Sequence, residues 1–373
     1  MVSVGGSGEG GGFLKRRLSI GLAVVLVLGV VAAIVWGRSG SSSGGDLTVV
    51  RGVIGSEKQA FFTDSRVVAA FAKHGLKVEV DTAGSRQIAT TVDLAKYGFA
   101  FPSSSPAAQK IQRDRKVTTV YTPFQSPMAI ATFEPIVALL SANGVVHKGA
   151  GDYQVLDVAK YLQLTQAGTR WDQLPGNTAY PVRKNVLVTT TDPRESNSAA
   201  MYLSIVSFVA NGNNVVSSAD QESKVLPQVA KLFLDQGYTQ NSTDGPFEDY
   251  LSAGMGKTPL ALIYESQYVD RLVRADGSIR PDMRMLYTAP TVYSKHTLVP
   301  LSPNGDQVGQ LLSTDPELGG LAATFGFRTT NPKLFADVVA KAKAPVPADL
   351  VDSVEPPSFE TLERMLDAIQ SQY

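Results

Sequence analysis

Cysteine is absent from the 373 residues of this chain. Its absence excludes disulfide bonds, a thiolate nucleophile and cysteine-ligated metal sites. It also excludes the lipid-bearing cysteine of a bacterial lipoprotein. Any binding chemistry must therefore come from other side chains.

Histidine and net charge are scarce as well. His74, His147 and His296 lie far apart in the sequence and form no His-x-x-x-His pair, so we predict surface or packing roles for them, no metal site and no cofactor. The 34 basic and 34 acidic residues cancel. Without a basic field to attract nucleic acid, no nucleic-acid partner is expected.

Two enzyme signatures are also missing. The sequence GMGKT at 254–258 ends like a phosphate-binding P-loop, but Leu251 stands where the first glycine is required, and Pro259 leads into a strand rather than a helix. No serine is followed three residues later by lysine, which a penicillin-recognising serine enzyme requires. We predict that the chain is not an enzyme. An enzyme on this fold would need a histidine or a close carboxylate pair in its binding pocket.

One long apolar run is present near the N-terminus. Residues 18–36 carry no charge and, as a helix, would extend about 30 Å, the thickness of a bilayer core. The basic cluster at 15–17 precedes the run, which predicts a single-pass signal anchor with residues 1–17 disordered in the cytoplasm and the main body outside. Residues 37–46 are rich in Gly and Ser and should form a flexible linker. A cleaved signal peptide is the alternative.

The remainder of the chain alternates short apolar runs with segments of helical periodicity. We expect strands over 47–55, 76–84, 98–103, 116–123, 127–132, 182–193, 259–266, 283–292 and 296–302. We expect helices over 58–75, 85–97, 133–143, 152–166, 196–212, 220–237, 246–253, 306–323, 332–343 and 358–372. This order predicts an α/β fold with mostly parallel sheets, large enough for two domains.

Small hydroxyl residues follow five of the expected strands. They occur in the loops Gly55–Lys58, Ala83–Arg86, Pro102–Ser105, Phe124–Pro127 and Asp192–Ser198. Ligands of open α/β sheets collect at strand ends, where serine hydroxyls and the N–H groups of helix N-termini can hold a polar or anionic group. Serine and asparagine are also ordinary helix caps, so a purely structural role remains open for each residue.

Four segments resemble the two-lobed periplasmic solute-binding proteins of the molybdate-, sulfate- and phosphate-binding branch. They are VIGSEKQAFFTD at 53–64, DTAGSRQIAT at 81–90, TTTDPRESNSAAMYL at 189–203 and PLALIYESQYV at 259–269. The resemblance implies a type II fold of that class. It implies that residues 47–124 and 286–373 form lobe 1 and residues 125–285 form lobe 2, with crossings near 121–125 and 287–293.

The resemblance also implies a ligand cleft between the lobes. Ser56 and Ser85 would face Ser196 and Ser198 across it, with Tyr264 at the end of a strand of the second lobe. Arg86, Arg194, Glu57 and Glu265 depart from the family pattern: the arginines would favour a carboxylate or phosphate ligand, whereas the glutamates would repel it. The predicted ligand-binding residues are Ser56, Glu57, Ser85, Arg86, Ser103, Ser126, Ser196, Asn197, Ser198 and Tyr264.

These expectations give a function. The chain should be a membrane-tethered extracytoplasmic protein that captures a small polar or anionic ligand between its lobes and presents it to a transporter or sensor. The alternative is a cell-envelope interaction module on the same fold with a degenerate cleft. The alternatives differ in whether Ser56, Ser85, Ser196 and Ser198 converge on one pocket.

Overall fold

The computed structural model describes residues 47–193, 196–236, 244–347 and 352–372. The expected cytoplasmic segment 1–17, membrane anchor 18–36 and linker 37–46 lie outside these residues. Of the helices in the described part of the chain, none combines the length and the apolarity needed to cross a bilayer.

The first half of the sheet, called here the β1 half, is built from four strands. β1 (Thr48–Ile54) pairs in parallel with both β2 (Leu76–Thr82) and β3 (Phe99–Phe101), and β9 (Tyr293–Pro300) runs antiparallel to β3. Val50, Val53 and Ile54 of β1 are buried, as expected for a strand covered on both faces. The parallel strands end at the same edge, where the loops after β1, β2 and β3 meet.

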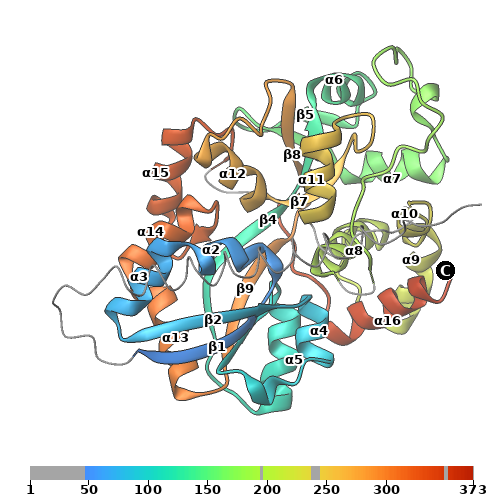
Figure 1. The fold of residues 1–373 in the computed structure, drawn as a ribbon. Helices are drawn as coiled ribbons and strands as arrows, with labels where there is room; N and C mark the ends of the chain where they lie inside the picture. The colour runs from blue at the N-terminus through green and yellow to red at the C-terminus, as the bar shows by residue number, and fades with distance from the viewer. Residues whose placement is uncertain (1–46, 194–195, 237–243, 348–351, 373) are drawn as a thin grey trace, which may run out of the picture. The chain divides into compact units, whose positions relative to one another are not determined.

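Strand β4 (Tyr121–Phe133) connects the two halves of the sheet. Its first part pairs antiparallel with β9 and β10 (Arg328–Thr329), and its second part pairs antiparallel with β7 (Ala261–Tyr264) and β8 (Met283–Ala289). The second half, called the β8 half, continues through β6 (Gln154–Asp157) to β5 (Val146–Lys148). In Figure 1 the teal strand β4 runs from one group of strands into the other.

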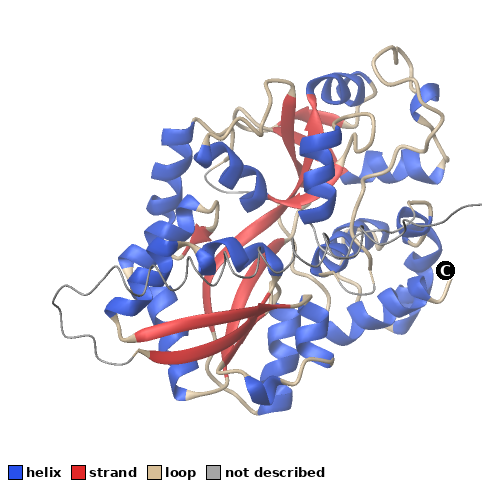
Figure 2. Ribbon diagram, in the orientation of Figure 1, coloured by secondary structure: helices blue, strands red, loops and turns tan. Residues whose placement is uncertain are grey.

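Helices flank the strands on either side (Figure 2). Those of the N-terminal region are η1 (Ser56–Lys58), α2 (Gln59–Thr63), α3 (Ser65–Lys73), α4 (Ser85–Thr90), η2 (Leu94–Lys96) and α5 (Ser105–Arg115). The central ones are α6 (Glu134–Ala142), α7 (Val158–Gln166), η3 (Trp171–Gln173), α8 (Asn197–Ala210), α9 (Ala219–Val229), α10 (Lys231–Leu234), α11 (Asp244–Ala253) and α12 (Glu265–Arg274). The last are α13 (Pro303–Thr314), α14 (Pro316–Thr324), α15 (Pro332–Ala342) and α16 (Phe359–Gln370).

The apolar core is divided in the same way as the sheet. One cluster joins the β8 half to α6, α7 and α8, while two others cover the faces of the β1 half. Helix α16 spans this division: Phe359 packs in a cluster of the β1 half, whereas Leu362, Met365, Leu366 and Ile369 pack in the cluster of the β8 half. The prediction placed all of 286–373 in lobe 1, but the apolar face of α16 is buried mainly with the segment predicted as lobe 2.

Several expected elements differ from the structure. The helix expected over 58–75 is interrupted at Asp64, whose backbone is extended and whose side chain accepts from the Arg66 N–H to begin α3. The strand expected over 182–193 forms only isolated bridges, at Asn185 and Thr189. The sheet is mixed rather than mostly parallel, because β4 pairs antiparallel with four strands. Helices α5 and α12 were not expected.

Candidate functional site

A small cavity of about 30 Å³ lies where the loops of the β1 half meet α8 and β7. Its walls are formed by Gly55, Ser56, Glu57, Ala83, Gly84, Ser85, Ser103, Ser196, Asn197 and Tyr264. Seven of the ten predicted ligand-binding residues are among them. They come from both halves of the sheet and from five separate segments of the chain.

Local structure explains why these side chains converge. Ser56 and Glu57 form the 3-10 turn directly after β1, Ser85 opens α4 after β2, and Ser103 follows β3. Because β1, β2 and β3 are parallel neighbours, their ends lie at one sheet edge. From the other half, Ser196 is the N-cap residue of α8. Tyr264 ends β7, with its side chain buried.

Hydrogen bonds cross the cavity. Asn197 Nδ2 donates to the Ser103 carbonyl oxygen at 3.3 Å and to the Tyr264 hydroxyl oxygen at 3.0 Å. The Ser103 N–H donates to Ser85 Oγ at 2.8 Å, and Ser294 Oγ donates to the Ser103 carbonyl oxygen. Asn197 therefore ties α8 to the loop after β3, so the two halves are closed over the cavity.

A buried charged cluster lies against this cavity. Lys58 Nζ donates to Glu57 Oε1, to Ser103 Oγ at 2.8 Å and to His296 Nδ1 at 3.1 Å. Ser103 Oγ also donates to Glu57 Oε1. Lys58 and His296 are fully buried, and the Glu57 side chain is only 6% exposed. The pairing fits the rule that charges are buried only with a partner of opposite sign.

The cluster fixes the protonation of its members. Burial opposes ionisation of Glu57, but the Lys58 ammonium outweighs it and holds the pKa of this carboxyl well below its usual range. Burial and the Lys58 charge lower the pKa of His296 to about 4, so this ring is neutral at pH 7. Burial and the Glu57 charge raise the pKa of Tyr264, which keeps its hydroxyl proton. The cavity wall thus carries one ionised carboxylate among neutral donors and acceptors.

The contact with Lys58 also selects the His296 tautomer. Nδ1 must accept from the ammonium, so the ring proton of the neutral form lies on Nε2. Nε2 is buried and has no hydrogen-bond partner among the described residues. A buried donor without an acceptor costs about 1–3 kcal/mol.

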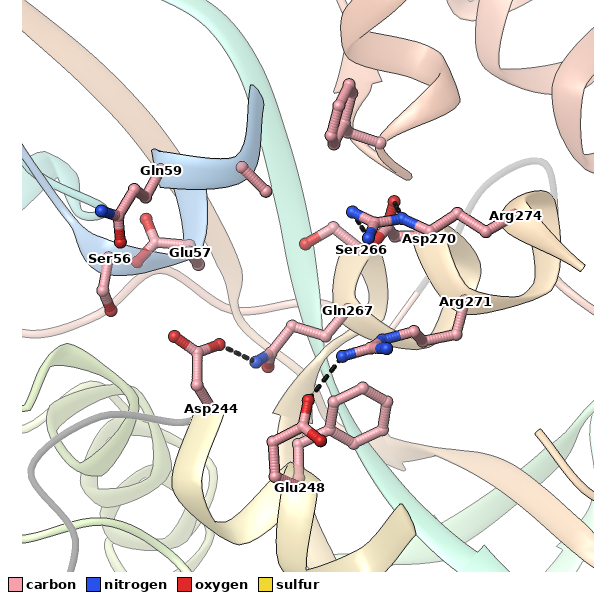
Figure 3. Close-up of a pocket in the computed structure, with 13 residues that line it drawn as sticks. Ser56, Glu57, Gln59, Asp244, Glu248, Ser266, Gln267, Asp270, Arg271 and Arg274 are labelled. Carbon is pink, nitrogen blue, oxygen red and sulfur yellow. Dashed lines mark hydrogen bonds and ion pairs between the residues drawn. The ribbon is translucent and has the colours of Figure 1, made fainter. Parts of the chain in front are cut away.

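A second, larger pocket of about 230 Å³ shares two walls with the small cavity, Ser56 and Glu57 (Figure 3). Its other walls come mainly from α2, α11 and α12 and are Gln59, Ala60, Asp244, Phe247, Glu248, Ser266, Gln267, Asp270, Arg271, Arg274 and Phe325. Gln267 Nε2 donates to Asp244 Oδ1 at 2.9 Å, and Arg271 Nη2 donates to Glu248 Oε1 at 2.5 Å. We call the two spaces the inner cavity and the outer pocket.

Three predicted ligand-binding residues do not line the inner cavity. Ser126 Oγ accepts from the Ser266 N–H at 3.0 Å and so begins α12 against β4. Ser198 Oγ lies 2.7 Å from Thr191 Oγ1 and 2.9 Å from Ser196 Oγ, behind the cavity wall.

Arg86 is the third of these residues. It is not among the residues that line the inner cavity, and its guanidinium binds Glu363 and Asp367 of α16 and the carbonyl oxygen of Pro193. It therefore supports the wall in which Ser85 lies. Of the other charges noted in the sequence, Arg194 lies outside the described residues, and Glu265 forms a buried ion pair with Arg328 at 2.7 Å.

Sequence reasoning missed Lys58 and His296. Lys58 was expected to end the loop after the first strand and to begin the helix over 58–75, without a binding role, and His296 was expected to be a surface or packing residue. Position 296 opens an apolar strand, which was the available signal for a buried histidine, whereas nothing in the sequence distinguishes Lys58 from a surface lysine. In the described ranges, no three His, Asp or Glu residues lie close enough together to hold a metal ion.

Comparison with known proteins places this geometry in a fold class. No protein-family model matches the sequence, and no curated protein matches it. Among solved structures, the sulfate-binding protein SubI from Mycobacterium tuberculosis H37Rv is similar, with a TM-score of 0.52, 17% identity, and coverage of 87% of this chain and 99% of that one. A periplasmic thiamin-binding protein gives a TM-score of 0.51 at 10% identity, with 89% and 99% covered. At these identities the likeness concerns the fold, and the chain has the two-lobed α/β fold of periplasmic solute-binding proteins.

Proposed function

We propose that this chain is a solute-binding protein that captures a small polar solute between its two lobes, without covalent chemistry, and delivers it to a transporter or sensor. The observation that carries the proposal is the convergence of Ser56, Ser85, Ser103 and Asn197 on one inner cavity. Folds of this kind host many functions, so the proposal depends on the cavity and not on the fold. The similar proteins named above are described as sulfate- and thiamin-binding.

The walls supply suitable binding groups. The first turn of α8 starts at Asn197, and its backbone N–H groups precede the first i to i−4 bonds of the helix. The hydroxyls of Ser56, Ser85 and Tyr264 can donate or accept, so they suit a ligand with several polar atoms. A carboxylate, Glu57, completes the wall.

Binding requires movement of the lobes. The inner cavity has room for only a few atoms, and Asn197 spans it to Ser103 and Tyr264. A solute must therefore reach the site in a conformation where the Asn197–Ser103 contact is broken, and closure re-forms it around the ligand. We propose that residues 47–124, together with the part of 286–373 that precedes α16, move against residues 125–285. The hinge would be β4 and the 287–293 connection.

A thermal-shift screen tests this function. We expect one class among oxyanions, organic acids, amino acids, sugars and amines to raise the Tm of the purified protein by several degrees, because a ligand at about 100 times its Kd adds about 2.7 kcal/mol to stability. Asn197→Ala should weaken that binding at least tenfold, since it removes the bonds that close the site. Asn304→Ala, exposed in the first turn of α13, is the matched control and should bind normally. Absence of any shift over the whole panel would favour the interaction-module alternative.

We also propose that residues 18–36 tether the protein to the cell membrane, with the body outside. Because the chain has no cysteine, single-cysteine labelling can test the topology directly. In intact cells, a membrane-impermeant maleimide should label Ser42→Cys, whereas Ser7→Cys should react only after permeabilisation. Both variants should remain in the membrane fraction after a carbonate wash. Release of a shortened protein into the soluble fraction would instead indicate a cleaved signal peptide.

A further inference from the structure

Glu57 occupies a special position between the two spaces. Its side chain is more than nine-tenths buried, yet it forms part of the wall of both the inner cavity and the outer pocket. Figure 3 shows it on the turn after β1, with its carboxylate beside Ser56 and Gln59. A solute that extends from one space into the other must pass this carboxylate.

The partners of Glu57 hold it in place from behind. Lys58 and His296 contact Oε1, but neither is among the described residues that line the inner cavity and the outer pocket. A solute in the cavity therefore meets the carboxylate directly, while the neutralising ammonium lies in the protein interior. A fixed buried acceptor favours a hydrogen-bond donor and disfavours a second anion, because like charges brought together in a dry site repel strongly.

The outer pocket also disfavours an anionic ligand. Four carboxylates line it, those of Glu57, Asp244, Glu248 and Asp270, against two guanidinium groups. Both guanidinium groups already contact carboxylates: Arg271 contacts Glu248 at 2.5 Å and Asp276 at 3.6 Å, and Arg274 contacts Asp270 at 2.8 Å. An incoming anion would have to compete with these ion pairs.

Aromatic rings complete the outer pocket. Phe247 and Phe325 line it, and the guanidinium carbon of Arg274 lies 5.7 Å from the centre of the Phe325 ring. An aromatic face attracts cations, and apolar carbon atoms pack against it. The pocket thus suits a short carbon chain that ends in a positive group.

From this geometry we infer that the cleft selects an amine-bearing solute, with an ammonium group that donates to Glu57 and a carbon chain that extends into the outer pocket. Glu57 is the specificity-determining residue. Lys58 is the positioning residue that holds its carboxylate, and His296 in turn accepts from Lys58. This inference rests on the proposed solute-binding function and names the ligand class of the same site. The sequence predicted a small polar or anionic ligand. The inference favours a polar ligand that donates hydrogen bonds and disfavours an oxyanion.

Isothermal titration calorimetry with 1,4-diaminobutane and with sulfate as separate probes tests the inference. We expect the full-length protein in detergent to bind the diamine and to bind sulfate at least tenfold more weakly. Glu57→Gln should weaken diamine binding at least tenfold, because a neutral amide cannot pair with an ammonium. Glu79→Gln, a half-buried carboxylate on β2, is the matched control and should leave diamine binding unchanged.

A second variant keeps the test decisive. Glu57→Gln leaves Lys58 without its buried counterion and can destabilise the fold, so the double variant Glu57→Gln/Lys58→Met removes both charges together. It should fold and still lose diamine binding. Preference for sulfate, or unchanged diamine affinity in a folded Glu57 variant, would overturn the amine assignment and leave the solute-binding function standing. A protein that binds no solute of the wider panel would contradict both proposals.

Discussion

Replacing Arg328 with methionine will lower the free energy of unfolding by about 3–5 kcal/mol. The reason is Glu265, which is fully buried and lies at the first position of α12. Arg328 Nε donates to Glu265 Oε1 at 2.7 Å, and Nη2 donates to Oε2 at 2.8 Å. Methionine fills much of the same volume but leaves the carboxylate buried without its counterion.

The rest of the environment increases this dependence on Arg328. Its guanidinium also donates to the Pro347 carbonyl oxygen at 2.7 Å and lies 4.6 Å from the centre of the Phe335 ring. Tyr287 of β8 donates its hydroxyl to Glu265 Oε2. The cluster joins β8, β10 and α12 around the β4 crossing, and no side chain in it reaches bulk water easily. Water therefore cannot replace the lost interaction cheaply.

Urea unfolding of the purified protein measures the effect. Arg66→Met is the matched control: Arg66 forms a two-point pair with Asp64, but its side chain is 58% exposed, so its loss should cost no more than about 1 kcal/mol. The double variant Arg328→Met/Glu265→Gln should recover a large part of the stability, because no net charge remains buried. If Arg328→Met lowers the free energy of unfolding no more than the control does, the fold does not depend on the Arg328–Glu265 ion pair.

This ion pair also shows what sequence reasoning can find in such a chain. Glu265 stood out because it follows Tyr264 at a predicted strand end, and the structure places Tyr264 at the end of β7. Its partner at 328 is distant in sequence, and no local pattern connects the two. Local periodicity reports which face of an element is buried, but it carries no information about which charges meet across the fold.

The same reasoning explains which elements were predicted well. β1, β2 and α8 are apolar runs with clear boundaries, and their observed limits lie close to the expected ones. The expected strand at 182–193 has the right residues, with Val186 and Val188 buried, but it reaches the sheet only at Thr189 beside Ala261. A buried extended segment and a sheet strand share one sequence pattern, so pairing decides between them.

The binding residues also divide into those that local sequence could predict and those that depend on distant segments of the chain. Residues that follow a strand at a shared sheet edge, such as Ser56, Ser85 and Ser103, could be predicted because parallel strands bring their ends together. Arg86 could not be placed, since its direction depends on α16, far along the chain. Lys58 and His296 belong to this second class: only the folded chain brings them within 3.1 Å.

Stability should also fall as the pH drops below neutrality, and His296 gives the largest identifiable part of that change. Burial and the Lys58 charge lower its pKa to about 4, against about 6.5 in an unfolded chain. Between these values the unfolded state binds more protons than the folded state, so stability rises with pH. The contribution is fully present above the unfolded value and is lost as the pH falls towards 4. Linkage gives a loss of about 2 kcal/mol between pH 7 and pH 5, and about 3 kcal/mol by pH 4.

The neighbours of His296 act in the same direction, which makes a matched variant necessary. Glu57 has a lowered pKa in the folded protein, so its contribution is also lost in acid, but only below the ordinary carboxyl range.

His296→Asn places an amide oxygen near the position of Nδ1, where it can still accept from Lys58, and removes the titration. Urea unfolding at pH 7 and pH 5 should therefore show a clearly smaller pH dependence for His296→Asn than for the wild type. His147→Asn, at an exposed site on β5, should retain the wild-type slope. Equal slopes for all three proteins would mean that His296 is able to accept a proton in the folded chain, and the assignment of a neutral ring beside Lys58 would then be wrong.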